Sequence, residues 1–261
     1  MLTVAIPAGL LIGLSLGALG GGGSILTVPA LVYLLHQEPH AATTGSLLIV
    51  GITALAGMIA HRRAGRVRFA QGITFGVLGV AGSYAGTRLS AHIAPDLLLT
   101  MFAVLMLAAA GAMLRRRRDP DGRTAPAPRW RHPSRAVSGG VRVVAAATAV
   151  GLLTGFFGVG GGFVIVPALV LALGFDMPAA VGTSLLVIAI NSAAALAARF
   201  GGHVHLDWPL LAVFTAAALA GTFAGNRVAS RADASRLTAA FAVLLAAVAV
   251  YSLGRSLPGL V

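Results

Sequence analysis

The chain has 261 residues, of which 57% are hydrophobic and only 10% are charged, and its mean hydropathy is +0.91. This composition excludes a water-soluble globular domain, because the polar side chains are too few to cover its surface, and it predicts an all-α polytopic membrane protein. The formal net charge is +12 and cysteine is absent, which excludes disulfides and thiolate chemistry.

Eight apolar stretches approach or exceed the length of about 20 residues that a helix needs to span a bilayer. They cover residues 4–34, 43–60, 70–90, 96–114, 143–173, 180–198, 208–229 and 236–254. The first stretch lacks a basic start and a cleavage site, so we expect it to remain in the protein as a span.

The two halves of the chain are related by an internal duplication. Residues 13–48 recur at residues 151–186 with a constant offset of 138, and 17 of the 36 aligned positions are identical. We therefore predict two homologous repeats of four segments, at residues 1–114 and 143–261, joined by a linker at residues 115–142.

A glycine run followed by a proline interrupts the first stretch of each repeat. The glycines are Gly20, Gly21, Gly22, Gly23, Gly158, Gly160, Gly161 and Gly162, and we select all of them except Gly21 as candidate site residues. Such breaks at matching places in two halves typically mark the substrate site of a secondary transporter. Unwound backbone there, with the N-terminus of the next half-helix and the nearby Ser24, would form a cradle for an anion. The alternative is that the glycines only allow close helix packing.

Each broken stretch is about 30 residues long and would overshoot the bilayer as one straight helix. It either crosses once, which makes the repeats parallel, or folds back, which makes them inverted. We favour the fold-back because something in the stretch must bend. The arginine distribution fits both alternatives, and both place the linker in the cytoplasm.

The second span of each repeat carries polar side chains. In the first repeat we select Thr44 and Ser46, and in the second Thr183, Ser184 and Asn191. Hydroxyl and amide groups can complete the hydrogen bonds of an oxyanion without a fixed charge. The alternative is that these groups form ordinary hydrogen bonds between helices.

Arginine supplies all 19 basic residues, and nine of them lie in the linker between Arg115 and Arg142. This pattern indicates a cytoplasmic anchor that also contacts anionic lipid headgroups, and not a nucleic-acid site. Arg88 and Arg227 end similar segments of the two repeats, where they either reach the headgroups or attract an anion.

The same two segments repeat a pair of glycines. Gly82 and Gly86 in the first match Gly221 and Gly225 in the second, and the four-residue spacing predicts that each pair lies on one helix face for close packing.

Metal and catalytic sites are not supported by the sequence. The pair His203 and His205 and the pair His36 and His40 lie in predicted loops without a third ligand at dependable spacing. Neither a histidine nor a carboxylate is evident inside a span, so nucleophilic catalysis has no base. We expect no enzyme activity, metal or cofactor, and any coupling to ions must use other groups.

The segments GLSLGALGGGGSILTVPALVYLL, AATTGSLLIV and GSYAGTRLS, with their echoes in the second half, resemble the TauE/SafE sulfite exporter family. The resemblance covers nearly the whole chain except the linker. It implies a bacterial inner-membrane permease for sulfite, sulfonates or related sulfur-containing anions, with its site at the glycine runs and the polar second spans. The sequence thus predicts alternating access between the repeats, with export as the direction. An anion channel, or a permease for another organic anion or a metal ion, remains the alternative, and the oligomeric state stays open.

Overall fold

A computed structural model describes residues 2–90, 95–118, 136–157, 162–198 and 206–256. Within these residues all regular secondary structure is helical, which confirms the all-α prediction. The elements are α1 (Leu2–Leu19), α2 (Gly22–Pro29), the π-helical segment η1 (Ala30–Leu34), α3 (Pro39–Arg63), α4 (Phe69–Ser90), α5 (Pro95–Arg118), α6 (Ala136–Phe157), α7 (Gly162–Leu171), α8 (Met177–Ala197), α9 (Trp208–Arg231) and α10 (Ala234–Ser256).

Four of the described helices, α3, α8, α9 and α10, are long and apolar enough to cross a membrane. The helices α1, α5, α6 and α7, and α2 with η1, contain shorter apolar segments. Large apolar side chains are exposed on the outside of the bundle, such as Leu11, Val77 and Val243, as expected where helices face lipid. The arrangement in eight spanning segments stays a prediction.

Three helices begin with an acidic residue followed by a proline in the first turn. The acidic residues are Glu38 before α3, Asp176 before α8 and Asp207 before α9. Proline suits the first turn because it lacks the N–H group that would remain unpaired there. At α9 the carboxylate also caps the helix, since Asp207 Oδ1 accepts a hydrogen bond of 3.1 Å from the Leu210 amide.

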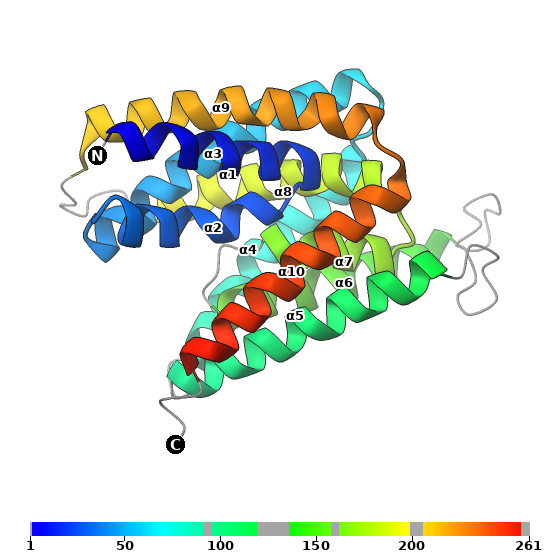
Figure 1. Cartoon of the computed structure of the whole chain (residues 1–261). Helices are drawn as coiled ribbons and strands as arrows, with labels where there is room; N and C mark the ends of the chain where they lie inside the picture. Colours follow the sequence, from blue (N-terminus) through cyan, green and yellow to red (C-terminus); the bar gives the residue numbers. More distant parts are fainter. Residues whose placement is uncertain (1, 91–94, 119–135, 158–161, 199–205, 257–261) are drawn as a thin grey trace.

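The helices pair across the two halves of the chain. Helix α1 packs mainly against α9, and α4 packs mainly against α6. Helix α3 packs against α8, and α5 packs against α10, which Figure 1 shows as the green and red helices that meet at the lower left. Each of these pairs joins one predicted repeat to the other, so neither half can fold into its observed packing without its partner.

Glycines bring the α1–α9 and α4–α6 pairs into backbone contact. A Cβ atom at Gly221 or Gly225 would collide with the carbonyl oxygen of Leu10 or Leu14 in α1. At Gly82 of α4, it would lie 2.9 Å from the amide nitrogen of a residue in α6. The four-residue spacing of these glycines therefore does place them on one packed helix face.

The chain reverses direction between α1 and α2. Gly20 has a positive φ of 74°, and a Cβ atom at Gly23 would lie 2.8 Å from the Leu16 Cβ atom of α1. Ala5, near the start of α1, shares a buried cluster with Leu35, directly after η1. Figure 1 shows α2 returning along α1, which is the geometry of the fold-back alternative. The corresponding connection between α6 and α7 lies outside the described residues.

Helices α5 and α6 extend into the segment that the sequence assigns to the linker. Residues 115–118 continue α5, and α6 begins at Ala136, so only residues 119–135 separate them. The apolar pattern ends earlier than the helix because arginine is a good helix former and Pro120 is the first strong helix breaker after α5. These linker ends are therefore helical.

Candidate functional site

The first glycine break meets the start of α7 and the middle of α8. A Cβ atom at Gly20 would lie 2.5 Å from Ser184 Oγ, and one at Gly21 would overlap the carbonyl group of Gly162. A Cβ atom at Gly162 would in turn collide with Ser24 Oγ. We call these five residues, Gly20, Gly21, Ser24, Gly162 and Ser184, the glycine junction. The sequence predicts four of these residues as part of the site, and Gly21 is the one that it does not predict.

Two helix N-termini converge at the glycine junction. Gly21 is the N-cap of α2 and makes no side-chain cap, and Gly162 is the first residue of α7. The first N–H groups of a helix have no partner within the helix, and the helix dipole makes this end positive. The described carboxylates Glu38, Asp176, Asp207 and Asp233 are exposed, so none of them lies buried in the junction. The junction therefore offers a partial positive charge without a fixed one, as anion sites at helix N-termini do.

The two hydroxyl groups of the junction bond to their own helices. Ser24 Oγ donates to the carbonyl oxygen of Gly21 at 2.7 Å, and Ser184 Oγ donates to that of Val181 at 2.8 Å. A hydroxyl hydrogen can rotate toward another acceptor, and each hydroxyl oxygen also accepts. Both serines can therefore exchange a local bond for one to a ligand.

Two glycines of the first run point away from the junction. A Cβ atom at Gly22 would lie 2.5 Å from Leu244 Cδ2 of α10, and one at Gly23 would contact Leu16 of α1. Successive residues of a helix point about 100° apart, so neighbouring glycines meet different helices. Gly22 and Gly23 thus contribute close packing, which is the alternative that the sequence left open for the run.

Thr183 and Asn191 also lie apart from the junction. Thr183 Oγ1 accepts a hydrogen bond of 3.1 Å from the Arg68 amide and so anchors the α3–α4 connection. Asn191 is seven residues beyond Ser184, about 10 Å along α8. Its side chain lies 3.6 Å from the Cβ position of Gly79, and its Oδ1 is buried without a hydrogen-bond partner.

The polar residues of α3 are the counterparts of those in α8. Thr44 and Ser46 are both buried, and Ser46 Oγ donates to the Thr43 carbonyl oxygen at 2.8 Å. By the offset of 138, Ser46 corresponds to Ser184 and Gly158 corresponds to Gly20. The counterpart of the Gly20–Ser184 contact therefore falls on Gly158, which lies outside the described residues, as do Gly160 and Gly161.

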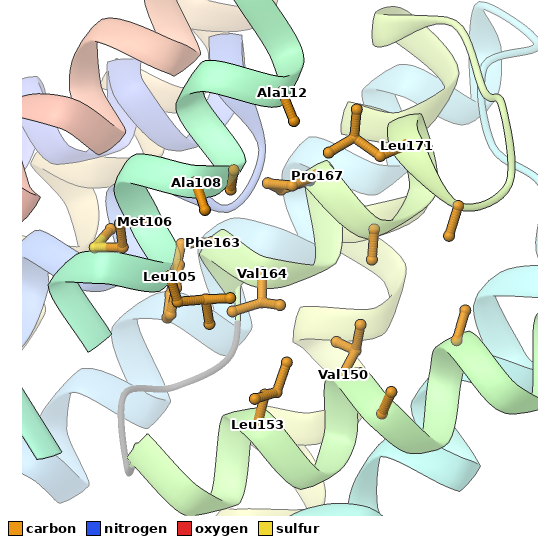
Figure 2. Close-up of a pocket in the computed structure, with 15 residues that line it drawn as sticks. Leu105, Met106, Ala108, Ala112, Val150, Leu153, Phe163, Val164, Pro167 and Leu171 are labelled. Atoms are coloured by element: carbon orange, nitrogen blue, oxygen red, sulfur yellow. The ribbon is translucent and has the colours of Figure 1, made fainter. Parts of the chain in front are cut away.

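A cavity of about 370 Å³ lies beside the junction, between α5, α6 and α7 (Figure 2). Its lining includes Leu105, Leu153, Phe163, Val164 and Pro167, and every residue around it is apolar. Figure 2 shows these side chains directed into the space between the three helices. Because no lining side chain can donate a hydrogen bond, this cavity does not suit an anion.

His61 is a residue that the sequence reasoning missed. The sequence suggests that it begins a basic loop, but the structure places it in the last turn of α3, where only 1% of it is exposed. Its Nε2 lies 3.3 Å from the Gly17 carbonyl oxygen, and its Nδ1 is buried without a partner. His61 falls within the candidate span Ala41–Arg63, so the expectation that no histidine lies inside a span is wrong. The apolar run ends at residue 60, so hydropathy gives no sign that the helix buries one more turn.

The remaining candidates are peripheral or outside the described residues. Arg88 and Arg227 are exposed, and Arg88 Nη2 donates to Tyr84 Oη at 2.9 Å, an arrangement suited to the headgroup region. Among the described residues no three His, Cys, Asp or Glu side chains come together. His203 and His205 lie outside these residues.

Comparison with known proteins supplies the family. The chain matches the family described as "Sulfite exporter TauE/SafE" over residues 5–252, which is nearly its whole length. The chain belongs to the TauE/SafE family. As a TauE/SafE protein it is a membrane transporter and not an enzyme, as the resemblance in the glycine-proline segments implied.

Relatives of this TauE/SafE protein occur in bacteria and archaea. A "Probable membrane transporter protein" of Xylella fastidiosa strain Temecula1 is 34% identical, with 100% of this chain and 98% of the relative aligned. The "Probable membrane transporter protein YdhB" of Bacillus subtilis is 28% identical over 83% of this chain and 86% of its own. A protein of Methanocaldococcus jannaschii, "Probable membrane transporter protein MJ0441", is 24% identical over 74% and 70%. No solved structure matches the chain.

Proposed function

We propose that this protein carries sulfur-containing anions, such as sulfite or organosulfonates, across the bacterial inner membrane by alternating access, with export as the direction. The observation that supports it most is the contact between Gly21 and Gly162, which brings the N-termini of α2 and α7 together. An anion bound there would accept hydrogen bonds from backbone N–H groups and from Ser24 and Ser184. Because the junction joins the two repeats, relative motion of the repeats would open it to alternate sides.

The topology that we propose is the inverted one. With α2 folded back along α1, the α3–α4 connection, the end of α5, the start of α6 and the α9–α10 turn lie at the same end of the bundle. This end carries most of the arginines, so the positive-inside tendency assigns it to the cytoplasm. The arginines of the linker would then lie near anionic headgroups.

The test is efflux of labelled sulfite from liposomes that contain the purified protein, compared with empty liposomes. Unlabelled sulfoacetate and taurine serve as competitors. We expect saturable efflux that a sulfonate competitor slows and that external unlabelled sulfite accelerates by exchange. Flux that neither saturates nor responds to external anion would indicate a channel instead. Flux no faster than in empty liposomes, from protein shown to be folded, would refute this substrate class.

A further inference from the structure

His61 is the buried titratable group of the described helices that the anion site leaves unused. The Gly17 carbonyl oxygen can only accept, so Nε2 must carry a hydrogen and donate to it across 3.3 Å. In the neutral ring Nδ1 then carries a lone pair and no hydrogen, so it can only accept a hydrogen bond. It is buried without a partner. A buried polar atom without a partner is rare in folded proteins and calls for an explanation.

Both contacts of His61 lead to the glycine junction. Gly17 precedes Gly20 by three residues on α1, which is about 4.5 Å along the helix axis. On α8, the Cβ position of Gly182 lies 3.1 Å from His61 Cβ, and Gly182 precedes Ser184 by two residues, about 3 Å along the axis. The histidine is therefore within about one helical turn of the residues that would hold the anion.

The charged groups around His61 are all basic or exposed. The α3–α4 connection supplies Arg62, Arg63, Arg66 and Arg68, of which Arg66 is half-buried and acts on the ring electrostatically. The described parts of α1 and α8 contain no titratable side chain. At this end of the bundle the described carboxylates are Asp176 and Asp233, and both are exposed. A protonated His61 would thus have no carboxylate beside it, and an anion would be its natural partner.

We infer that His61 binds a proton together with the transported anion, which makes the transporter a proton–anion symporter. This rests on the proposed function. A proton from water on one side forms an N–H bond at Nδ1, and this group donates a charge-assisted hydrogen bond to an oxygen of the anion. On the other side the N–H bond breaks and the proton returns to water. One proton then moves with each anion, and nothing is oxidised or reduced.

Symport makes the direction depend on the pH gradient. For a monoanion the coupled step is electrically neutral, so the membrane potential does not drive it. The anion is exported only when the ratio of its concentration inside to that outside is larger than the ratio of the proton concentration outside to that inside. Arg66, whose amide donates to the His61 carbonyl oxygen, adds a second positive charge near a charged imidazolium. This disfavours binding of the proton without the anion, which reduces proton leak when substrate is absent.

The experiment uses liposomes with the membrane potential clamped at zero and labelled 2-hydroxyethanesulfonate, a monoanion whose charge is constant near neutral pH. Two activities are measured: exchange of label at equal pH, and accumulation driven by an acidic exterior. The wild-type protein should show both, with up to about tenfold accumulation for each unit of pH difference, since one unit corresponds to a factor of ten. His61→Gln, whose amide can still donate to Gly17, should lose accumulation, and it should exchange label more slowly than the wild type because the hydrogen bond from Nδ1 to the anion is lost. The control His36→Asn changes an exposed histidine with a φ of 53°, which asparagine tolerates, and should keep both.

The outcomes separate the two proposals. If His61→Gln accumulates anion like the wild type, or if the wild type exchanges but never accumulates, the symport inference is overturned and the proposed function stands. If the wild type does not exchange sulfonate or sulfite, the proposed function fails and the inference fails with it. A dye that reports the pH inside the liposomes gives a test without any variant. Anion entry should acidify the interior of wild-type liposomes, and entry without acidification would overturn symport.

Discussion

Gly21→Ala is expected to lower anion transport by about tenfold or more. The new Cβ atom would overlap the Gly162 carbonyl group, and backbone on both sides cannot move aside without separating α2 from α7. Overpacking of this kind typically costs roughly 1–3 kcal/mol, and about 1.4 kcal/mol is a factor of ten in an equilibrium. The measurement is initial exchange of labelled sulfite in liposomes, at matched protein content.

Substitutions at two other glycines serve as controls for Gly21→Ala. At Gly22 a Cβ atom meets only the flexible end of Leu244, so Gly22→Ala should have a smaller effect. At Gly111 of α5 it meets nothing within 4 Å, so Gly111→Ala should transport like the wild type. Unchanged transport by Gly21→Ala, or equal losses in all three variants, would contradict the role of the junction.

Gly13→Ala should destabilise the folded protein by about 1–3 kcal/mol, a typical cost of overpacking. Its Cβ atom would collide with the Ala218 carbonyl group of α9, and the nearby Gly17 packs against Thr222 of the same helix in the same way. The α1–α9 pair would have to separate along its length. Thermal unfolding in detergent should show a lower midpoint for this variant than for the wild type.

The matched control for that variant is Gly254→Ala in α10, where no heavy atom lies within 4 Å of the new Cβ position. Alanine is favoured over glycine within a helix by roughly 0.5–1 kcal/mol, so this control should be neutral or slightly stabilising. If Gly13→Ala were as stable as Gly254→Ala, the close backbone contact of α1 with α9 would be wrong.

The sequence predicted the helical class and the packing glycines well because both depend on local pattern. Apolar runs mark α3, α8, α9 and α10, and a spacing of four residues puts Gly221 and Gly225 on one face of α9. The reversal after α1 was one of two alternatives, since hydropathy is the same for a hairpin and for a single crossing. The structure separates them through the return of α2 along α1.

The composition of the candidate site was only partly predictable. Which glycine of a run meets the other repeat depends on helix rotation, and so Gly21 was missed while Gly22 and Gly23 were included. His61 was missed for a related reason, because its burial comes from contacts with α1 and α8 that no local pattern encodes. Tertiary packing determines which glycine faces the other repeat and whether His61 is buried, and neither composition nor residue spacing predicts this packing.

Protection of one introduced thiol by substrate would show whether the transported anion binds at the glycine junction. The chain has no cysteine, so Ser24→Cys creates a single reactive site, and Ser230→Cys on the exposed end of α9 is the control. Labelling with a maleimide is timed with and without sulfoacetate, because sulfite itself consumes maleimides. We predict that saturating sulfoacetate slows labelling of the first variant and leaves the second unchanged. Equal labelling of Ser24→Cys with and without anion, in protein that still transports, would contradict binding of the anion at the junction.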